Sequence, residues 1–431
     1  MKKTLLTFAA LFASTLSILA QSGNPLATFK INQTGGEFTI TLASTEAATS
    51  YSVDFGDGNL VTAATTQAYD GWDGSVEISG TPAAGSTVKI YSTGKITYLQ
   101  AFGKTTASRI ETADVTKLVD LTELDLHNNQ LATIDLSQNT MLKKLDLNNN
   151  SFTSINLAAN TALTTLDLSA NVGLNSIDLT ANTALTKLTL SKCLMTTLDI
   201  SANKALRSCY LLDMGLTNLT VGEKTGTGFI LSVNNNKLTT LDLRQATGLD
   251  GKGRLFATNN NLTEILYVKI GTANISGNKF TFANLPTANI KTLTYAPQQP
   301  MEIAINGSSV DLSAQQADTY KWLTTDGDEL VAGTDYTEES GKFTFLKTPT
   351  KPVYCVLESS RFPKFVGSNA FKTTTIEPVG TAIVLSTADN ATAAAAYYTL
   401  DCTFVSTNKA QLPAGLYIVK NGKKAVKVMV K

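Results

Sequence analysis

The segment LTELDLHNNQL, from Leu121 to Leu131, indicates the fold of this chain, because near copies of it follow at a fixed spacing. The next copies are LKKLDLNNNSF from Leu142 and LTTLDLSANVGL from Leu163, and LTKLTLSKCLM and LRSCYLLDMGL come after them. The second leucine recurs every 21 or 22 residues, and Cys209 takes its place in the fifth copy. Self-similarity at this period predicts a solenoid of stacked coils.

The pattern returns three more times after the irregular segment VGEKTGTG. These copies are ILSVNNNKL, RLFATNNNL and ANISGNKF, so eight repeats are countable between Leu121 and Phe280. The shared phrase LxxLxLxxN/CxL resembles the leucine-rich-repeat consensus in its short bacterial form, over residues 96–290. That resemblance implies a solenoid that presents one continuous binding face.

Each residue type in the phrase has a mechanical role. The two leucines of LxL lie on one side of a short strand and point into the solenoid, whereas the residue between them points outward, because side chains alternate along a strand. The asparagine that follows lies where the chain turns inward, and its amide can pair backbone groups that would otherwise be buried without partners. We call these residues the first asparagine column: Asn129, Asn150, Asn171, Asn236, Asn260 and Asn278.

A similar phrase fills the opposite half of each coil, as in SINLAANTAL and SIDLTANTAL. It predicts a second asparagine column, formed by Asn139, Asn160, Asn182 and Asn203. This doubling leaves little room for helices, so we expect extended or 3₁₀ segments there. The predicted fold class is mostly β, a leucine-rich-repeat solenoid flanked by small β-sandwich domains.

Residues 21–95 alternate as short strands between Gly and Asp turns, which predicts a small N-terminal β domain. Its phrase SVDFGDGN, from Ser52, resembles the signature of polycystic-kidney-disease-type sandwiches. Asp54 and Asp57 in this phrase are possible Ca²⁺ ligands, but Asp-Gly pairs most often form tight turns, and we favour the turn. The same holds for the DGDE cluster from Asp326. The later phrase ITYLQAF resembles a degenerate strand that precedes the first repeat.

Residues 291–378 predict a separate β-sandwich, after a proline-containing linker from Pro297 to Pro300. Strand-like runs such as TYKWLTTDGDEL and KPVYCVLES alternate with turn signals. Trp322, about thirty residues before Cys355, resembles the tryptophan of immunoglobulin-like domains. The earlier partner cysteine of such domains is missing, so we expect no inter-sheet disulfide.

The two ends of the chain are expected to carry export signals. Residues 1–20 combine two lysines, an apolar run and a small residue before Gln21, which is typical of a signal peptide, and no later stretch is long enough for a transmembrane helix. Residues 379–431 end in a run with Asn421 and Gly422 at a hairpin turn. This tail resembles type IX secretion sorting domains, which implies secretion machinery as a partner. It also fits the closing strands of the preceding sandwich.

Composition narrows the chemistry. Thirty-five basic residues balance thirty-five acidic ones, so charge gives no reason to expect nucleic acid as a partner. The single histidine, His127, excludes an HExxH zinc site, and as an outward residue it is more typical of a surface contact than of a catalytic base. Cys193 occupies an asparagine slot and Cys209 a leucine slot, so we expect buried, free thiols. We expect no cofactor and no metal.

The outward residues of the LxL strands are the best candidates for a site. Asp125, Asp146 and Asp167 follow one another on successive coils, about 4.8 Å apart if the strands pair directly. The plain reading is that LDL is the family's favoured strand phrase and the column is solvated. The functional reading is a concave ligand-binding surface, acidic at one end and aromatic or apolar at the other. Its candidate residues are Asp125, His127, Lys144, Asp146, Asp167, Lys187, Tyr210, Leu212, Ile230, Arg254 and Phe256.

The architecture resembles the secreted leucine-rich-repeat surface proteins of Gram-negative bacteria. The combination of repeats with an immunoglobulin-like segment also resembles the internalin adhesins. The resemblance implies a non-enzymatic protein, secreted or on the outer cell surface, that recognises an extracellular protein or glycan. Two alternatives are open. One is a structural stalk, and the other is a glycan or peptide hydrolase that uses paired carboxylates such as Asp125 and Asp146.

Overall fold

The computed structural model describes residues 23–32, 36–71, 73–83, 85–103, 109–380, 396–400, 403–421 and 424–430. The predicted signal peptide, residues 1–20, lies outside them. The chain forms two compact units, Met1–Gln299 and Pro300–Lys431. The boundary between them falls in the proline-containing segment after the last repeat.

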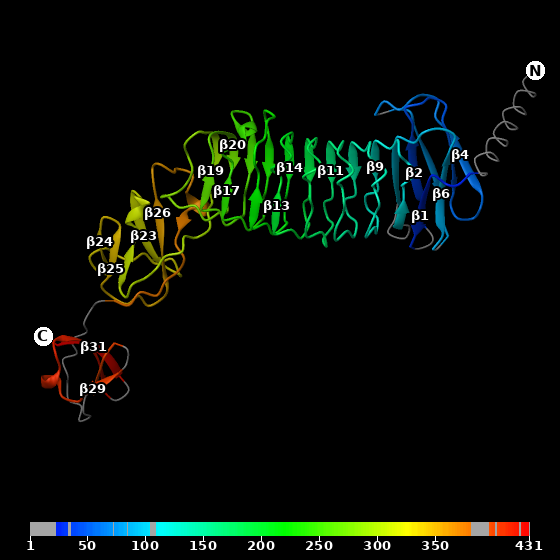
Figure 1. Ribbon diagram of the computed structural model, residues 1–431. Helices are drawn as coiled ribbons and strands as arrows, with labels where there is room; N and C mark the ends of the chain where they lie inside the picture. The colour runs from blue at the N-terminus through cyan, green and yellow to red at the C-terminus, as the bar shows by residue number, and fades with distance from the viewer. Residues whose placement is uncertain are drawn as a thin grey trace, which may run out of the picture. The chain divides into compact units, whose positions relative to one another are not determined.

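The first unit is built around a solenoid of short parallel strands, which stand side by side in Figure 1. Each of the eight repeats contributes one strand, and one further strand, β21, extends the stack beyond the repeats recognised in the sequence. The strands are β9 (Glu123–Asp125), β10 (Lys144–Asp146), β11 (Thr165–Asp167), β12 (Lys187–Thr189), β14 (Ser208–Tyr210), β16 (Ile230–Ser232), β18 (Arg254–Phe256), β20 (Ile270–Asn274) and β21 (Ile290–Thr294).

The register of these strands follows the leucines. Leu145 lies opposite Leu124 on one side and Leu166 on the other. The residues before and after Leu145 are aligned with their counterparts in the same way. The paired leucines are almost fully buried, and burying one such side chain contributes about 1.5–3 kcal/mol. Because a single coil has no second layer to cover its leucines, stacking provides the core. The predicted fold class, a mostly β solenoid, is confirmed.

The opposite side of the coils is extended, as expected. It carries two parallel pairs of strands, and one 3₁₀ turn, η1 (Thr247–Leu249), lies in the chain between the two strands of the second pair. Figure 1 shows strands of both pairs along this side of the stack. The pairs are β13 (Thr197–Asp199) with β15 (Asn218–Thr220), and β17 (Thr240–Asp242) with β19 (Glu264–Leu266).

The N-terminal strands continue directly into the solenoid. A five-stranded sheet has the order β4-β3-β6-β1-β8, while β5, β2 and β7 extend the solenoid sheet. Strand β7 pairs in parallel with β9, so it is the degenerate strand that the sequence predicted before the first repeat. The bounds are β1 (Ala27–Ile31), β2 (Phe38–Ala43), β3 (Ser50–Asp54), β4 (Leu60–Ala64), β5 (Ser75–Gly80), β6 (Thr87–Ser92), β7 (Tyr98–Gly103) and β8 (Ile110–Asp114).

The DFGDG phrase forms a tight turn. One carboxylate oxygen of Asp54 accepts hydrogen bonds from the backbone N–H groups of Gly56 and Gly58, at 2.8 and 3.0 Å. The other oxygen is 3.2 Å from the ammonium of Lys89. Gly56 has φ of +98°, and a Cβ there would meet Ser86, so the turn requires glycine. Because Asp54 is already satisfied, these contacts favour the turn over a Ca²⁺ site.

The first asparagine column is satisfied in both directions. The Asn150 amide donates to the carbonyls of Leu126 and Leu147, at 2.9 and 3.0 Å, and its oxygen accepts the N–H of Leu131 at 3.0 Å. The bonds therefore join each coil to the previous one. The other five members make the same kind of bonds.

The second asparagine column has a different pattern. The Asn160 amide donates to the carbonyls of Leu136 and Asn139, at 3.0 and 2.9 Å, while no described group donates to its buried oxygen. In the next coil after Asn203, the slot belongs to Lys224, whose fully buried ammonium donates to the carbonyls of Ile200 (3.0 Å) and Val221. Sequence inspection did not single out this lysine.

The second unit contains two three-stranded sheets and a four-stranded one. Trp322 is fully buried, with its ring centroid 5.0 Å from that of Phe345 and 5.5 Å from that of Phe343. The first two sheets have the orders β22-β25-β24 and β23-β26-β27. Their strands are β22 (Ser309–Asp311), β23 (Thr319–Thr324), β24 (Tyr336–Glu339), β25 (Lys342–Phe345), β26 (Val353–Glu358) and β27 (Phe371–Lys372), with 3₁₀ turns η2 (Ser313–Gln315) and η3 (Gly367–Asn369).

The tail forms the four-stranded sheet, with the order β29-β28-β30-β31. Its last two strands pair as an antiparallel hairpin with Asn421 opposite Lys424, where the sequence predicted one. The elements are β28 (Ala396–Tyr398), β29 (Phe404–Ser406), η4 (Lys409–Gln411), β30 (Gly415–Asn421) and β31 (Lys424–Val430). Among the described residues, no helix is both long and apolar enough to cross a membrane.

Candidate functional site

The outward side chains of the solenoid strands form three parallel columns, which we call the outward face. The middle column places Asp125, Asp146 and Asp167 directly opposite one another, as predicted. It continues through Thr189, Tyr210, Ser232, Phe256 and Asn274. The flanking columns contain the remaining candidates, with Lys144, Lys187, Ile230 and Arg254 on one side and His127 and Leu212 on the other.

The aspartates of the middle column have a structural function. In each, Oδ1 accepts the backbone N–H of the residue two positions later: Asp125 from His127 at 3.1 Å, Asp146 from Asn148 at 3.0 Å and Asp167 from Ser169 at 2.9 Å. The same bond recurs on the opposite side of the coils, at Asp135, Asp178, Asp199 and Asp242. The turn after the strand thus accounts for aspartate in LDL, which supports the plain reading of this residue type.

Burial distinguishes the outward aspartates from those on the opposite side, which are exposed. Burial raises the pKa of Asp146, and the neighbouring charges of Asp125 and Asp167 raise it further. Burial also acts to raise the pKa of Asp125, but hydrogen bonds from His127 and Gln100 outweigh it and lower that pKa. The middle column therefore contains two adjacent carboxyl groups whose proton affinities are shifted in opposite directions.

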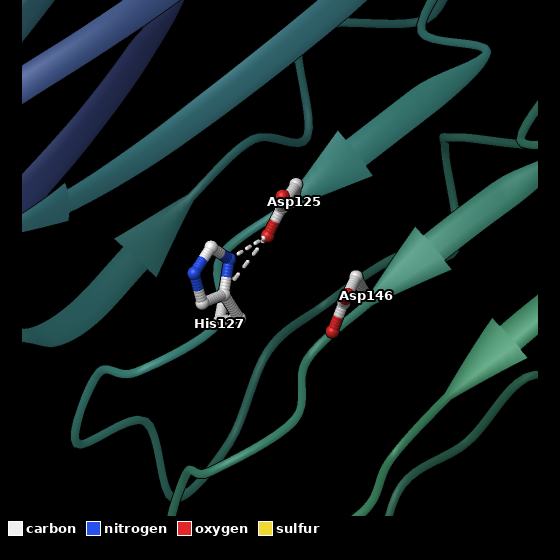
Figure 2. Close-up of side chains that lie close together, drawn as sticks. All are labelled: Asp125, His127 and Asp146. Carbon is white, nitrogen blue, oxygen red and sulfur yellow. Dashed lines mark hydrogen bonds and ion pairs between the residues drawn. The ribbon is translucent and has the colours of Figure 1, made fainter. Parts of the chain in front are cut away.

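His127 completes a cluster at the N-terminal end of the column (Figure 2). Its Nδ1 is 2.5 Å from Oδ1 of Asp125, and this hydrogen bond raises the pKa of the imidazole. One donor atom each from Asp125, His127 and Asp146 lie within 4.8 Å of one another. The side chains of His127 and Asp125 are 25% and 22% exposed, so the cluster is accessible but not fully solvated.

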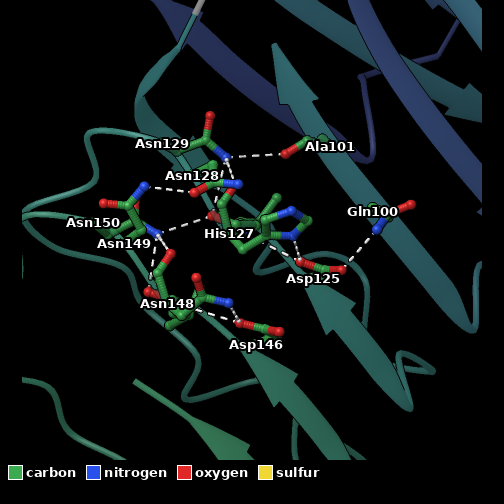
Figure 3. A network of polar contacts seen from close by, with 12 residues as sticks. Gln100, Ala101, Asp125, His127, Asn128, Asn129, Asp146, Asn148, Asn149 and Asn150 are labelled. Atoms are coloured by element: carbon green, nitrogen blue, oxygen red, sulfur yellow. Dashed lines mark hydrogen bonds and ion pairs between the residues drawn. The ribbon is translucent and has the colours of Figure 1, made fainter. Parts of the chain in front are cut away.

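A wider network supports this cluster (Figure 3). Gln100 donates to Oδ2 of Asp125 at 2.7 Å, and the ring of Phe102 lies 5.3 Å from the imidazole of His127. Tyr98 lies on the same strand, β7, with its ring 5.2 Å from that of Tyr69. Sequence reasoning missed these residues, although alternation along ITYLQAF places Tyr98, Gln100 and Phe102 on the outward side.

The basic candidates do not neutralise the aspartates. Lys144 forms an ion pair with Glu123 at 2.9 Å. Lys187 and Arg254 are exposed on β12 and β18. Among the described ion pairs, none joins these basic residues to the aspartates of the middle column.

The apolar candidates lie farther along the face. Tyr210, Leu212, Ile230 and Phe256 are all partly exposed. Tyr210 and Phe256 are two strands apart, with the small, buried Ser232 between them. The two rings therefore flank a shallow polar position and do not form one continuous aromatic patch.

The cysteines of the described residues are free and buried, as predicted for Cys193 and Cys209. Cys193 lies in an asparagine slot, and its Sγ donates to the carbonyl of Leu168 at 3.3 Å, so it retains part of the asparagine's function. Burial raises the pKa of Cys193 to about 11 and that of Cys209 to about 12. Both thiols are therefore protonated at neutral pH and act as packing groups.

No protein-family model matches the chain, and a search of curated proteins finds no relative. Solved structures of bacterial leucine-rich-repeat proteins are similar to it in fold. The functional domain of InlJ from Listeria monocytogenes, which includes a cysteine ladder, is 20% identical over 62% of this chain and 64% of its own length, with a TM-score of 0.40.

Two further structures are similar to parts of the chain. A leucine-rich-repeat protein of Leptospira interrogans is 19% identical over 44% of this chain and 63% of its own length, with a TM-score of 0.29. Internalin C2 of Listeria monocytogenes is 22% identical over 46% and 80%, also with a TM-score of 0.29. The chain thus spans less than two thirds of the length of the first two neighbours.

Proposed function

We propose that the chain is a non-enzymatic binding protein that recognises an extracellular protein, or a glycan, through the outward face of its solenoid. The main observation in support is the set of three aligned outward columns on one sheet, in which charged, polar and aromatic side chains lie in fixed register. Fixed spacing of this kind reduces the ordering cost of association, which favours recognition. The solenoid fold of the internalin-type neighbours supports the same proposal.

The contacts of Asp125 argue against the hydrolase alternative. One of its oxygens accepts two hydrogen bonds from His127, and the other accepts one from Gln100. A carboxylate held in this way is poorly placed to attack a substrate or activate water, although the opposed pKa shifts of Asp125 and Asp146 resemble those of a catalytic pair. Asp146 also caps its own turn, which gives both residues a function without catalysis.

A binding experiment separates recognition from a stalk role. The mature protein is immobilised and exposed to extracellular material, and the captured component is then titrated against the double variant Tyr210→Ala/Phe256→Ala. If these rings are anchors, affinity falls by more than about 2 kcal/mol. A matched control, Thr197→Ala/Thr240→Ala, changes exposed residues on the opposite side. Equal affinity for both double variants would place the interface elsewhere.

The parts of the chain on either side of the solenoid bear on where the protein is located. We infer that the protein is secreted or displayed on the outer surface of a Gram-negative bacterium, that its N-terminal and second-unit sheets are polycystic-kidney-disease-like and immunoglobulin-like modules, and that the tail is a type IX sorting signal. The last strand is lysine-rich and lies at the edge of its sheet, which supports a recognition role for the tail. Deleting residues 412–431 should leave a folded protein in the periplasm. Surface delivery of the truncated protein, or its failure to fold, would assign the tail to the sandwich.

A further inference from the structure

We propose that Asp125, His127 and Asp146 bind a divalent transition-metal ion, represented by Zn²⁺, at the N-terminal end of the outward face. The three residues offer two carboxylates and one imidazole from adjacent strands and the turn that follows the first (Figure 2). This mixed nitrogen and oxygen donor set suits zinc and its first-row neighbours, while Mg²⁺ and Ca²⁺ prefer oxygen donors alone.

The donor atoms are already gathered. One atom from each residue lies within 4.8 Å of the other two. Zinc bonds to nitrogen and oxygen are about 2.0–2.2 Å long, so modest side-chain rotation brings all three to an ion between them. Water would complete the coordination on the solvent side. Binding replaces the hydrogen bond between Nδ1 of His127 and Asp125, and the imidazole releases a proton if it carries one.

The repeat does not account for the histidine. The equivalent positions in the next four coils hold Asn148, Ser169, Ser191 and Leu212, so the turn needs no imidazole. The aspartates cap their turns, but only at this coil does a nitrogen ligand join them. The cluster thus combines two residues fixed by the fold with one that the fold leaves free to vary.

The surroundings favour an ion. Lys144 on β10 is paired with Glu123, and among the described contacts the ion-pair partner of Asp125 is His127. Gln100 holds the second oxygen of Asp125, and Phe102 lies against the imidazole. Outer contacts that orient ligands in this way are characteristic of metal sites.

Calorimetric titration of the full chain, carrying no histidine tag, with ZnCl₂ at pH 7.5 tests the proposal. His127→Asn and Asp146→Asn should each weaken Zn²⁺ binding at least about tenfold. Both variants should retain the fold, since Asn148 occupies the histidine slot of the next coil and Asn274 the aspartate slot of a later one. The control Asp178→Asn changes a turn aspartate on the opposite side and should bind as the parent does.

The single histidine gives a second measurement. Zn²⁺ should shift the imidazole signals of His127 in NMR spectra, and Co²⁺ should shift or broaden them paramagnetically, with saturation at the calorimetric stoichiometry. Unchanged imidazole signals at saturating metal, or equal Zn²⁺ affinity in the parent and His127→Asn, would overturn the site. Thermal melts of each variant without metal verify that any loss of binding is not a loss of fold.

Discussion

The two asparagine columns place the same residue on opposite sides of each coil, yet they use it differently. In the first column, Asn150 donates to two carbonyls and accepts one N–H. In the second, Asn160 only donates, and its oxygen accepts nothing from the described residues. A slot that needs only donors can hold any buried donor, and Lys224 is a donor without acceptor capacity. The first column sets a stricter requirement.

The largest expected effect is at the stricter column. Asn150→Ala should lower the free energy of unfolding by about 3 kcal/mol, because it leaves the Leu131 N–H buried without a partner and removes one of the two asparagine donors to each of two buried carbonyls. Chemical denaturation of the variant and the parent measures the difference. Ser154→Ala, an exposed change in the same coil, is the control. Identical unfolding midpoints for Asn150→Ala and the parent would remove the basis for the comparison.

Lys224 tests the second column through pH. Burial lowers the pKa of its ammonium to about 8 from the ordinary 10.5, so between these values the unfolded chain binds a proton that the folded chain does not. The contribution of Lys224 to stability should therefore rise by about 2–3 kcal/mol as pH increases from 8 to 10.5. Lys224→Asn lacks this titration. Over this pH range, the free energy of unfolding of the parent should therefore increase relative to that of Lys224→Asn. A difference between the two proteins that stays constant with pH would contradict this prediction.

Asn160→Ala tests the second column at one of its asparagines. It removes one donor from each of two carbonyls that keep a backbone N–H donor, and it also removes a buried oxygen without a donor, so the cost should be smaller, about 1–2 kcal/mol. The measurement is the same denaturation series used for Asn150→Ala. A cost equal to or above that of Asn150→Ala would show that the unpaired oxygen has no bearing on stability.

The smallest expected effect is at Cys193, which replaces the asparagine of the first column in its coil. Its thiol donates to the Leu168 carbonyl, and a thiol is a weak donor. Cys193→Asn should therefore raise the free energy of unfolding by about 0.5–1 kcal/mol, because the amide forms a stronger bond at the same position. Cys193→Ala is the matched control and should be destabilising. If both variants are destabilised alike, the slot at this coil has adapted to sulfur.

The repeats were predictable because their signal is local and recurs. The spacing of Leu124, Leu145 and Leu166 defines strand register, and register alone places Asp125 beside Asp146. Residue type was a poor guide where a position in the repeat buries a residue that is usually exposed. Lysine is usually a surface residue, so only alignment of VGEK with ISAN shows that Lys224 is buried in a column.

The candidate site was predictable in part. Alternation placed Asp125, His127 and Asp146 on one face, but the direction of the imidazole depends on Gln100 and Phe102, which belong to a strand outside the repeat. Strand β21 was missed because its phrase, IKTLT, lacks the asparagine that marks the other copies. Apart from Lys224, what escaped prediction thus lies at the two ends of the stack, where the repeat meets different neighbours.

The hydrogen bonds of the asparagine columns reach only from one coil to the one before it. A coil is therefore an interchangeable module. Its insertion or loss changes the length of the protein but leaves the contacts between the other coils unchanged. Duplication of the segment from Leu142 to Ala162 would add one more rung to the outward face and move the acidic and aromatic ends apart by one strand spacing, about 4.8 Å. Evolution can in this way adjust the reach of the surface by whole steps, independently of its chemistry.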